Sequence, residues 1–184
     1  MIYIIRLGHR IPRDERITTH VGLVGRIFGV KAVYYSGMKD IGFESSIDRV
    51  CDEWGGETKA IYVKNPKSFI EKLKKNGDII VHLTMYGERV EEVMDKVKER
   101  IKGKDIYLII GSEKVPSWVY DISTFNIAIT NQPHSEIAAL AIFLHELIDG
   151  KELNIEFEEA ITSGKKIKII PSKNGKVVEK QNNP

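Results

Sequence analysis

The stretch from Ile129 to Leu144 reads ITNQPHSEIAALAIFL and passes from a polar loop rich in turn formers into a long apolar helix. Pro133 ends the preceding strand, and His134 or Ser135 can begin the helix. Such a junction often holds a ligand, because the loop supplies amides and side-chain oxygens while the first helical turn supplies unpaired N–H groups. Taken alone, the stretch fits an ordinary strand-to-helix connection equally well, so the rest of the chain has to decide.

Short apolar runs alternate with amphipathic stretches along the first 149 residues. The apolar runs are β-branched or aromatic, and Gly, Asp or charged residues bound them, as is typical of strands. Several are apolar on both faces, like strands of a parallel sheet covered by helices on each side. The expected strands are Ile2–Arg6, Ala32–Tyr35, Thr58–Val63, Asp78–Leu83, Asp105–Ile110 and Phe125–Thr130. The expected helices are Thr18–Phe28, Phe43–Trp54, Pro66–Lys75, Arg89–Arg100 and His134–Leu147. The pattern predicts an α/β fold with a parallel sheet and helices on both faces.

The alternation of apolar runs and amphipathic stretches ends after Gly150. Two short runs, Lys166–Ile170 and Lys176–Val178, flank a Pro-Ser-Lys-Asn-Gly segment, and the Asn174-Gly175 pair has the chemistry of a hairpin turn. We therefore expect one domain over residues 1–150 and a C-terminal extension with a β-hairpin over residues 151–184.

The composition is that of an ordinary globular protein, with 42% hydrophobic and 29% charged residues in a chain of 184. Cys51 is the single cysteine, which excludes an intrachain disulfide or a Cys-rich zinc site and fits a reducing compartment. No run approaches the roughly 18 apolar residues of a membrane span. The sequence predicts a cytoplasmic protein that does not enter a membrane.

Positive charge is concentrated near the start of the chain. Residues 1–31 hold six Lys or Arg against two acidic residues, although the net charge of the whole chain is only +2. The guanidinium fork of arginine suits phosphate recognition, so nucleic acid is a reasonable partner. A solvated surface with ordinary ion pairs is the alternative.

The sequence lacks the motifs of several common kinds of site. No Gly-x-Gly-x-x-Gly follows a predicted strand and no Gly-Lys-Thr/Ser loop is present, so the chain has neither the dinucleotide fingerprint nor the nucleoside triphosphatase loop. The five histidines include no His-x-x-x-His pair beside a carboxylate, so we expect no metal. The absence of Gly-x-Ser-x-Gly leaves a hydrolase without support.

Polar groups follow three of the predicted strands, in Arg6–Phe28, Val81–Glu88 and Ile109–Pro116. Open α/β sheets bind ligands at the carboxyl ends of their strands. In the third segment a glycine admits close backbone approach, and a hydroxyl and a carboxylate follow it, which suits a nucleoside.

Three segments, in this order, resemble the SPOUT methyltransferase superfamily and, within it, the archaeal tRNA cytidine 2′-O-methyltransferase family. They are TTHVGLVGRIFG at Thr18–Gly29, IIGSEKVP at Ile109–Pro116 and TNQPHSE at Thr130–Glu136. The resemblance implies a trefoil-knotted α/β fold, a homodimer and S-adenosylmethionine held by the knotted loops. It further implies methylation of the ribose 2′-hydroxyl of cytidine at position 56, in the T loop of tRNA.

The resemblance also suggests which residues act. Arg26 falls on the motif-one arginine, where it would contact the target ribose or its phosphate and either help to remove the 2′-O proton or stabilise the alkoxide. The residues that match the cofactor loops are Leu83, Thr84, Gly111, Ser112, Glu113, Lys114, Val115, Ile129, Thr130, Asn131, Gln132, Pro133, His134, Ser135 and Glu136. Contact with the RNA backbone is assigned to Arg6, His9, Arg10, Arg13 and Arg16. His20 and Ile137 replace two asparagines of the superfamily pattern, so the roles of those asparagines do not transfer.

Two alternatives remain open at this point. An enzyme of the same fold that modifies another nucleotide, or a base nitrogen, would have the same cofactor loops. A non-catalytic RNA-binding module is the second alternative, although it would have no reason to keep the loops at Gly111 and Asn131.

Overall fold

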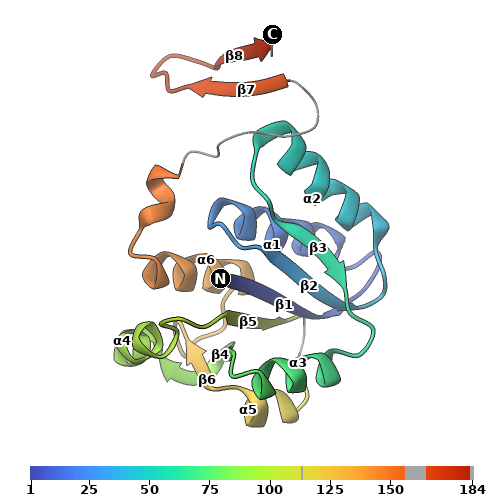
Figure 1. Cartoon of the computed structure of the whole chain (residues 1–184), viewed down its shortest axis with the longest axis vertical. Coiled ribbons are helices and arrows are strands. Elements are labelled where there is room, and N and C mark those ends of the chain that lie inside the picture. Colours follow the sequence, from blue (N-terminus) through green and yellow to red (C-terminus); the bar gives the residue numbers. More distant parts are fainter. Residues whose placement is uncertain (113, 156–164, 183–184) are drawn as a thin grey trace.

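The computed structural model of the protein describes residues 1–112, 114–155 and 165–182. Six strands form one parallel sheet (Figure 1). They are β1 (Ile2–His9), β2 (Ala32–Gly37), β3 (Lys59–Tyr62), β4 (Ile79–Arg89), β5 (Ile106–Gly111) and β6 (Phe125–Ala128). Their order across the sheet is β3-β2-β1-β5-β4-β6, which confirms the predicted parallel α/β architecture.

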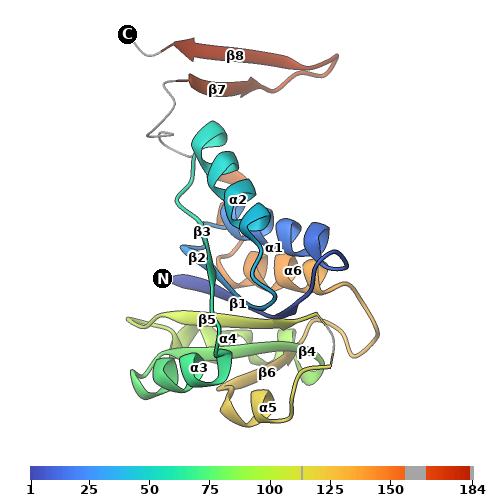
Figure 2. The same ribbon diagram turned by 90° about the vertical axis from the view of Figure 1, so that its right-hand side faces the viewer.

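Helices cover both faces of this sheet (Figure 2). They are α1 (Glu15–Ile27), α2 (Ile41–Trp54), α3 (Pro66–Lys75), α4 (Val90–Arg100), α5 (Trp118–Ile122) and α6 (Glu136–Leu147), followed by the 3-10 turn η1 (Lys151–Asn154). The larger hydrophobic core lies between the sheet and α1, α2, α4 and α6, and the smaller one lies under α3 and α5. Successive residues of β1 alternate between them, since Ile4 belongs to the larger core and Ile5 to the smaller one.

Several element boundaries differ from the predicted ones. β1 extends beyond Arg6 to His9, β4 extends beyond Leu83 to Arg89, and α6 begins at Glu136 rather than His134. β4 passes an irregularity after Leu83 and then pairs with β6 again, with Glu88 opposite Ile127. This extension, TMYGER, has no alternating or continuous apolar run, so no hydrophobic pattern marks it in the sequence. The short α5 was not predicted either, because five residues cannot establish a helical period.

The C-terminal strands β7 (Lys165–Ile170) and β8 (Val177–Asn182) pair antiparallel, which confirms the predicted hairpin. The division of the chain at residue 150 and the trefoil knot stay predictions. Among the described residues no helix is both long and apolar enough to cross a membrane.

Candidate functional site

The irregular part of β4 after Leu83 and the loops that follow β5 and β6 meet at one edge of the sheet, because the carboxyl ends of parallel strands share an edge. A cavity of about 230 Å³ lies among them and the first turns of α6. Seven of the predicted cofactor residues line it: Leu83, Thr84, Gly111, Ile129, Pro133, His134 and Glu136. Met85, Ile110, Ile127 and Ala139 complete the lining, so the cavity is a largely apolar slot with a few polar groups. The structure thus joins three segments that are far apart in the sequence.

The other predicted cofactor residues lie elsewhere. Ser112, Lys114 and Val115 line a neighbouring cavity, whereas Glu113 lies outside the described residues. Thr130, Asn131, Gln132 and Ser135 are exposed on the loop before α6 and do not line the slot. Ser135 is the N-cap of α6, where its Oγ accepts a hydrogen bond from the Ile137 N–H at 3.2 Å.

Asn131 fixes the loop before α6 to the extension of β4. Its Nδ2 donates to the carbonyl oxygens of Met85, at 2.8 Å, and Gly87, at 3.1 Å. Gly87 permits the close approach of β6 to this extension, because a Cβ there would lie 2.4 Å from the carbonyl oxygen of Asn126 on β6. One side-chain amide therefore holds two walls of the slot together.

Glu136 anchors the same loop to the centre of the sheet. Its Oε1 lies 2.8 Å from Nη1 of Arg6, whose side chain is fully buried, while the carboxylate is 27% exposed. Arg6 Nε also donates to Thr18 Oγ1 at 3.4 Å, which links the pair to α1. Burial raises the pKa of Glu136, an effect that Arg6 opposes, and burial lowers the pKa of Arg6.

The side chains of Arg6 and His9 are completely buried, so neither is exposed for the predicted contact with the RNA backbone. The ring of His9 lies 2.8 Å from Thr18 Oγ1 and 3.1 Å from Asp40 Oδ2, so it ties β1 to the start of α1 and α2. Arg6 and His9 are thus structural residues of the sheet edge.

The remaining basic residues of this segment do reach the surface. Arg13 and Arg16 are exposed, and the side chain of Arg10 is 33% exposed and paired with Asp14 at 3.0 Å. They surround the loop between β1 and α1, at the same edge of the sheet as the slot. This part of the predicted RNA surface is compatible with the structure.

Arg26 does not line the slot of its own chain, and its catalytic role stays a prediction. It sits in the last turn of α1, roughly 15 Å along the helix from Arg16 at about 1.5 Å per residue. Its Nε donates to the carbonyl oxygen of Gly55 at 2.6 Å, and its Nη2 donates to that of Trp54 at 2.5 Å. These carbonyls precede β3, so Arg26 joins α1 to the end of α2 at the amino edge of the sheet.

A partly buried polar network that the sequence did not reveal supports the slot from the opposite face. His82 Nδ1 lies 2.9 Å from Asn126 Oδ1, and Asn126 Nδ2 donates to the Tyr120 carbonyl oxygen at 3.1 Å. The hydroxyl of Tyr120 lies 3.1 Å from Thr84 Oγ1, a side chain of the slot. The only sequence signal was a polar residue, His82, within an apolar strand.

We expect acid to weaken this network. Burial lowers the pKa of His82 below its usual 6.5, so the folded protein holds a neutral ring. Its contribution to the free energy of unfolding is complete above pH 6.5 and is lost as the pH falls below 6.5, by at most about 1.4 kcal/mol per pH unit for one proton. Urea unfolding between pH 7.5 and 5 should show a smaller acid loss for His82→Gln than for the unaltered protein. An equal loss in both would assign the acid sensitivity to other groups.

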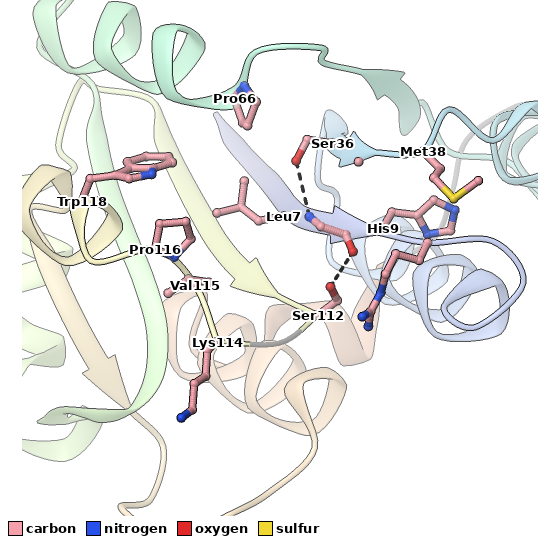
Figure 3. A pocket seen from close by; sticks show the side chains of 13 residues that line it. Leu7, His9, Ser36, Met38, Pro66, Ser112, Lys114, Val115, Pro116 and Trp118 are labelled. Carbon is pink, nitrogen blue, oxygen red and sulfur yellow. Dashed lines mark hydrogen bonds between the residues drawn. The ribbon is translucent and has the colours of Figure 1, made fainter.

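A second cavity, of about 380 Å³, opens at the same edge of the sheet beyond β1 and β2 (Figure 3). Trp118, Pro116 and Leu7 lie at one end of it, and Met38 and His9 lie at the other. Gly8 lines this cavity. Its N–H donates to Ser36 Oγ at 3.4 Å, and its carbonyl accepts from Ser112 Oγ at 2.6 Å. No group of three or more His, Cys, Asp or Glu side chains suited to a metal occurs in the described part of the chain.

Comparison with known sequences identifies close relatives. A family model described as tRNA ribose 2′-O-methyltransferase, aTrm56, matches residues 54–179. The chain is 46% identical, over 184 residues and 99% of both proteins, to the tRNA (cytidine(56)-2′-O)-methyltransferase of Methanocaldococcus jannaschii. It is 45% identical over 178 residues to the protein of the same name from Thermofilum pendens, which covers 96% of this chain and 94% of the relative.

Solved structures share the fold at low sequence identity. A TrmH/SpoU tRNA modifying enzyme of A. aeolicus has a TM-score of 0.58 at 17% identity, over 83% of this chain and 76% of its own. The SpoU methyltransferase AviRb of Streptomyces viridochromogenes, in complex with AdoMet, has a TM-score of 0.56 at 13% identity, over 82% and 57%. The predicted SPOUT architecture is thereby confirmed. Because the family model covers more than half of the chain and both relatives align along nearly all of it, the protein belongs to the tRNA ribose 2′-O-methyltransferase family aTrm56.

Proposed function

We propose that this protein methylates the ribose 2′-hydroxyl of cytidine at position 56 of tRNA, with S-adenosylmethionine as methyl donor. The observation that carries the proposal is the near full-length identity of 46% to a relative named for that reaction. The slot at the carboxyl edge of the sheet supplies a physical reason, because its position is where open α/β sheets bind nucleosides. A tRNA substrate supports a cytoplasmic location.

The slot suits the nucleoside part of the cofactor. Leu83, Ile110, Ile127 and Ile129 provide apolar walls for a purine ring, and Gly111 lets the ligand approach the backbone. Its volume of about 230 Å³ lies just below the usual range of small-molecule sites, so the remaining part of the ligand would extend along the loop before α6. When bound, the cofactor supplies an electrophilic methyl group. The trefoil knot that the family implies would hold the loops around the slot together.

The chain itself has to orient the acceptor ribose and favour loss of its proton. The exposed cations of the β1–α1 loop can hold the phosphates that flank the ribose, and positive charge near the 2′-oxygen stabilises the developing alkoxide. Arginine stays protonated, so this electrostatic role suits it better than that of a base. Arg26 could contribute only to the site of a neighbouring subunit, because it is remote from the slot of its own chain.

Arg16 gives the clearest test of the RNA surface. Arg16→Ala should weaken tRNA binding across all sequences and reduce the slope of log K against log salt by about 0.7 to 0.9, the value for one phosphate contact. Arg100→Ala is the matched control, since that exposed arginine ends α4 at the amino edge of the sheet. Filter binding from 50 to 300 mM KCl, an interval chosen to span the transition in affinity, measures both slopes. Identical slopes for the two variants would remove Arg16 from the RNA surface.

The structure also supports a homodimer. Ile17 and Ile27 of α1 and Ile142 of α6 are 38%, 45% and 44% exposed. The two helices pack against each other on one face of the sheet (Figure 2). Exposed apolar side chains of this kind are common at protein–protein interfaces, and a two-fold dimer would pair the same surface of two copies of the chain.

Ile142→Glu should therefore convert a dimer into a monomer, because it would bury a charge in the interface that these helices form. Sedimentation equilibrium measures the mass, and Glu71→Gln, an exposed change on α3 at the other face of the sheet, should leave it unaltered. An unaltered protein that sediments as a monomer would exclude the homodimer.

The function itself is tested with labelled S-adenosylmethionine and an unmodified tRNA transcript, followed by mapping of the labelled nucleotide. We expect label on C56 and none in a transcript with 2′-deoxycytidine at that position. Label on another nucleotide would keep the fold and cofactor but exclude the named target. Cofactor binding without transfer would favour the non-catalytic RNA-binding module.

A further inference from the structure

The second cavity, beside Gly8, has no assigned ligand. With about 380 Å³ it is larger than the cofactor slot and lies within the range of small-molecule sites. It opens where the chain leaves β1, β2 and β5, and Pro66 at the start of α3 and Trp118 at the start of α5 form part of its wall (Figure 3). A ligand about the size of one nucleoside fits such a volume.

The two cavities lie on opposite faces of the sheet. The slot is lined by Leu83, Ile110 and Ile127, which belong to the core under α1, α2, α4 and α6. The second cavity is lined by Leu7, and by Val115 and Trp118 that pack on the core under α3 and α5. The neighbours Gly111 and Ser112 divide between them, since Gly111 lines the slot and Ser112 lines the second cavity. A ligand in the second cavity would therefore lie on the other face of the sheet from the cofactor slot.

The chemistry of the second cavity suits an unpaired nucleotide. Trp118 and two prolines provide flat apolar surfaces, Ser36 and Ser112 provide hydroxyls, and Arg10 and Lys114 provide positive charge. No Asp or Glu occurs among the described residues that line it. Aromatic side chains combined with cations are the usual means of holding single-stranded RNA.

Trp118 also borders a neighbouring surface cavity on its other side. That cavity is lined by Lys67, Lys74 and Lys75 together with two acidic residues, Glu71 and Asp121. Lys67 Nζ lies 5.9 Å from the centre of the Trp118 ring. A base stacked on Trp118 would thus have an exposed lysine within reach of its phosphate.

We propose that the cavity lined by Trp118, Leu7 and Ser36 binds a second unpaired nucleotide of the tRNA, distinct from the methylated one. This inference rests on the proposed function. The base stacks on Trp118 and its phosphate lies near Lys67. The enzyme then holds two nucleotides of one loop across the edge of its sheet, which favours an RNA loop over a duplex whose bases remain stacked and paired.

Intrinsic fluorescence tests the contact directly, because the chain has only two tryptophans. The Trp54→Phe variant leaves Trp118 as the sole reporter, and Trp54 lies at the end of α2, close to the amino edge of the sheet. We expect saturable quenching by tRNA and none by S-adenosylmethionine alone. The converse variant, Trp118→Phe, should show little quenching by tRNA. If Trp118 is not quenched by a tRNA that the same variant methylates, the inference fails while the proposed function stands.

Kinetics then distinguish a second nucleotide from the acceptor. Trp118→Leu should raise KM for tRNA by roughly 5- to 100-fold, as expected for the loss of one stacked base, with kcat nearly unchanged. Trp118→Phe, which keeps a stacking ring, should recover most of the affinity, and Lys67→Glu should raise KM without altering the fold. The affinity for S-adenosylmethionine should stay the same in all three. A fall in kcat at saturating tRNA would place the acceptor itself in this cavity and overturn the proposal.

Discussion

Replacing Glu136 by alanine should lower the free energy of unfolding by about 3 kcal/mol or more, because it leaves the fully buried Arg6 without its carboxylate. Removing one partner of a buried ion pair costs more than removing both, since the remaining charge can neither hydrate nor find another anion. Arg6→Met should cost less than Glu136→Ala, because the carboxylate is 27% exposed and can still be hydrated.

Denaturant unfolding at pH 7.5 measures these differences, with Glu146→Ala, an exposed change on the same helix, as the control. The double variant Arg6→Met/Glu136→Leu should recover much of the loss from Glu136→Ala. Glu136 also lines the slot, so affinity for S-adenosylmethionine should fall in Glu136→Ala even where the protein remains folded. Equal free energies of unfolding for Glu136→Ala and Glu146→Ala would show that the ion pair between Arg6 and Glu136 does not stabilise the fold.

Alanine at Gly87 should be comparably severe. Its Cβ would lie 2.4 Å from the carbonyl oxygen of Asn126 and 2.5 Å from the Ile127 nitrogen, and both are backbone atoms that cannot rotate away. β4 and β6 would have to separate, at a cost of about 3 kcal/mol in stability. The Gly87 carbonyl would then lose its bond from Asn131, and the slot would lose the alignment of two of its walls.

Isothermal titration with S-adenosylmethionine and thermal unfolding measure the two effects of Gly87→Ala. Tyr86→Ala is the matched control, because the neighbouring tyrosine on the same strand is 73% exposed. A cofactor affinity in Gly87→Ala within twofold of the control would show that the spacing of β4 and β6 does not determine the slot.

The sequence was sufficient for the fold class because its evidence is local. Each parallel strand is a short apolar run between charged or glycine-containing turns, and each long helix has an amphipathic period, so neither needs a distant residue to be recognised. The loops at Gly111 and Pro133 were also correctly grouped, because the carboxyl ends of parallel strands must share an edge.

The sequence could not tell which of its polar residues would be buried. Arg6, His9, Arg13 and Arg16 all belong to one basic segment, yet the first two are enclosed and the last two are exposed. The difference arises because β1 continues to His9, and the alternation of side chains along it directs Arg6 towards α6 and Glu136. Glu136 is far from Arg6 in the sequence, so no local pattern predicts this ion pair.

By itself, then, the sequence determined the parallel α/β architecture, the hairpin and the family. Periodicity, turn residues and motifs can each be recognised from residues that are close together in the sequence. Only the tertiary structure decided that Arg26 lies at the amino edge and that His82, Tyr120 and Thr84 form one network. It likewise separated the second cavity from the cofactor slot. These features depend on which side chains meet across strands and helices, and that is set by the packing of the whole chain.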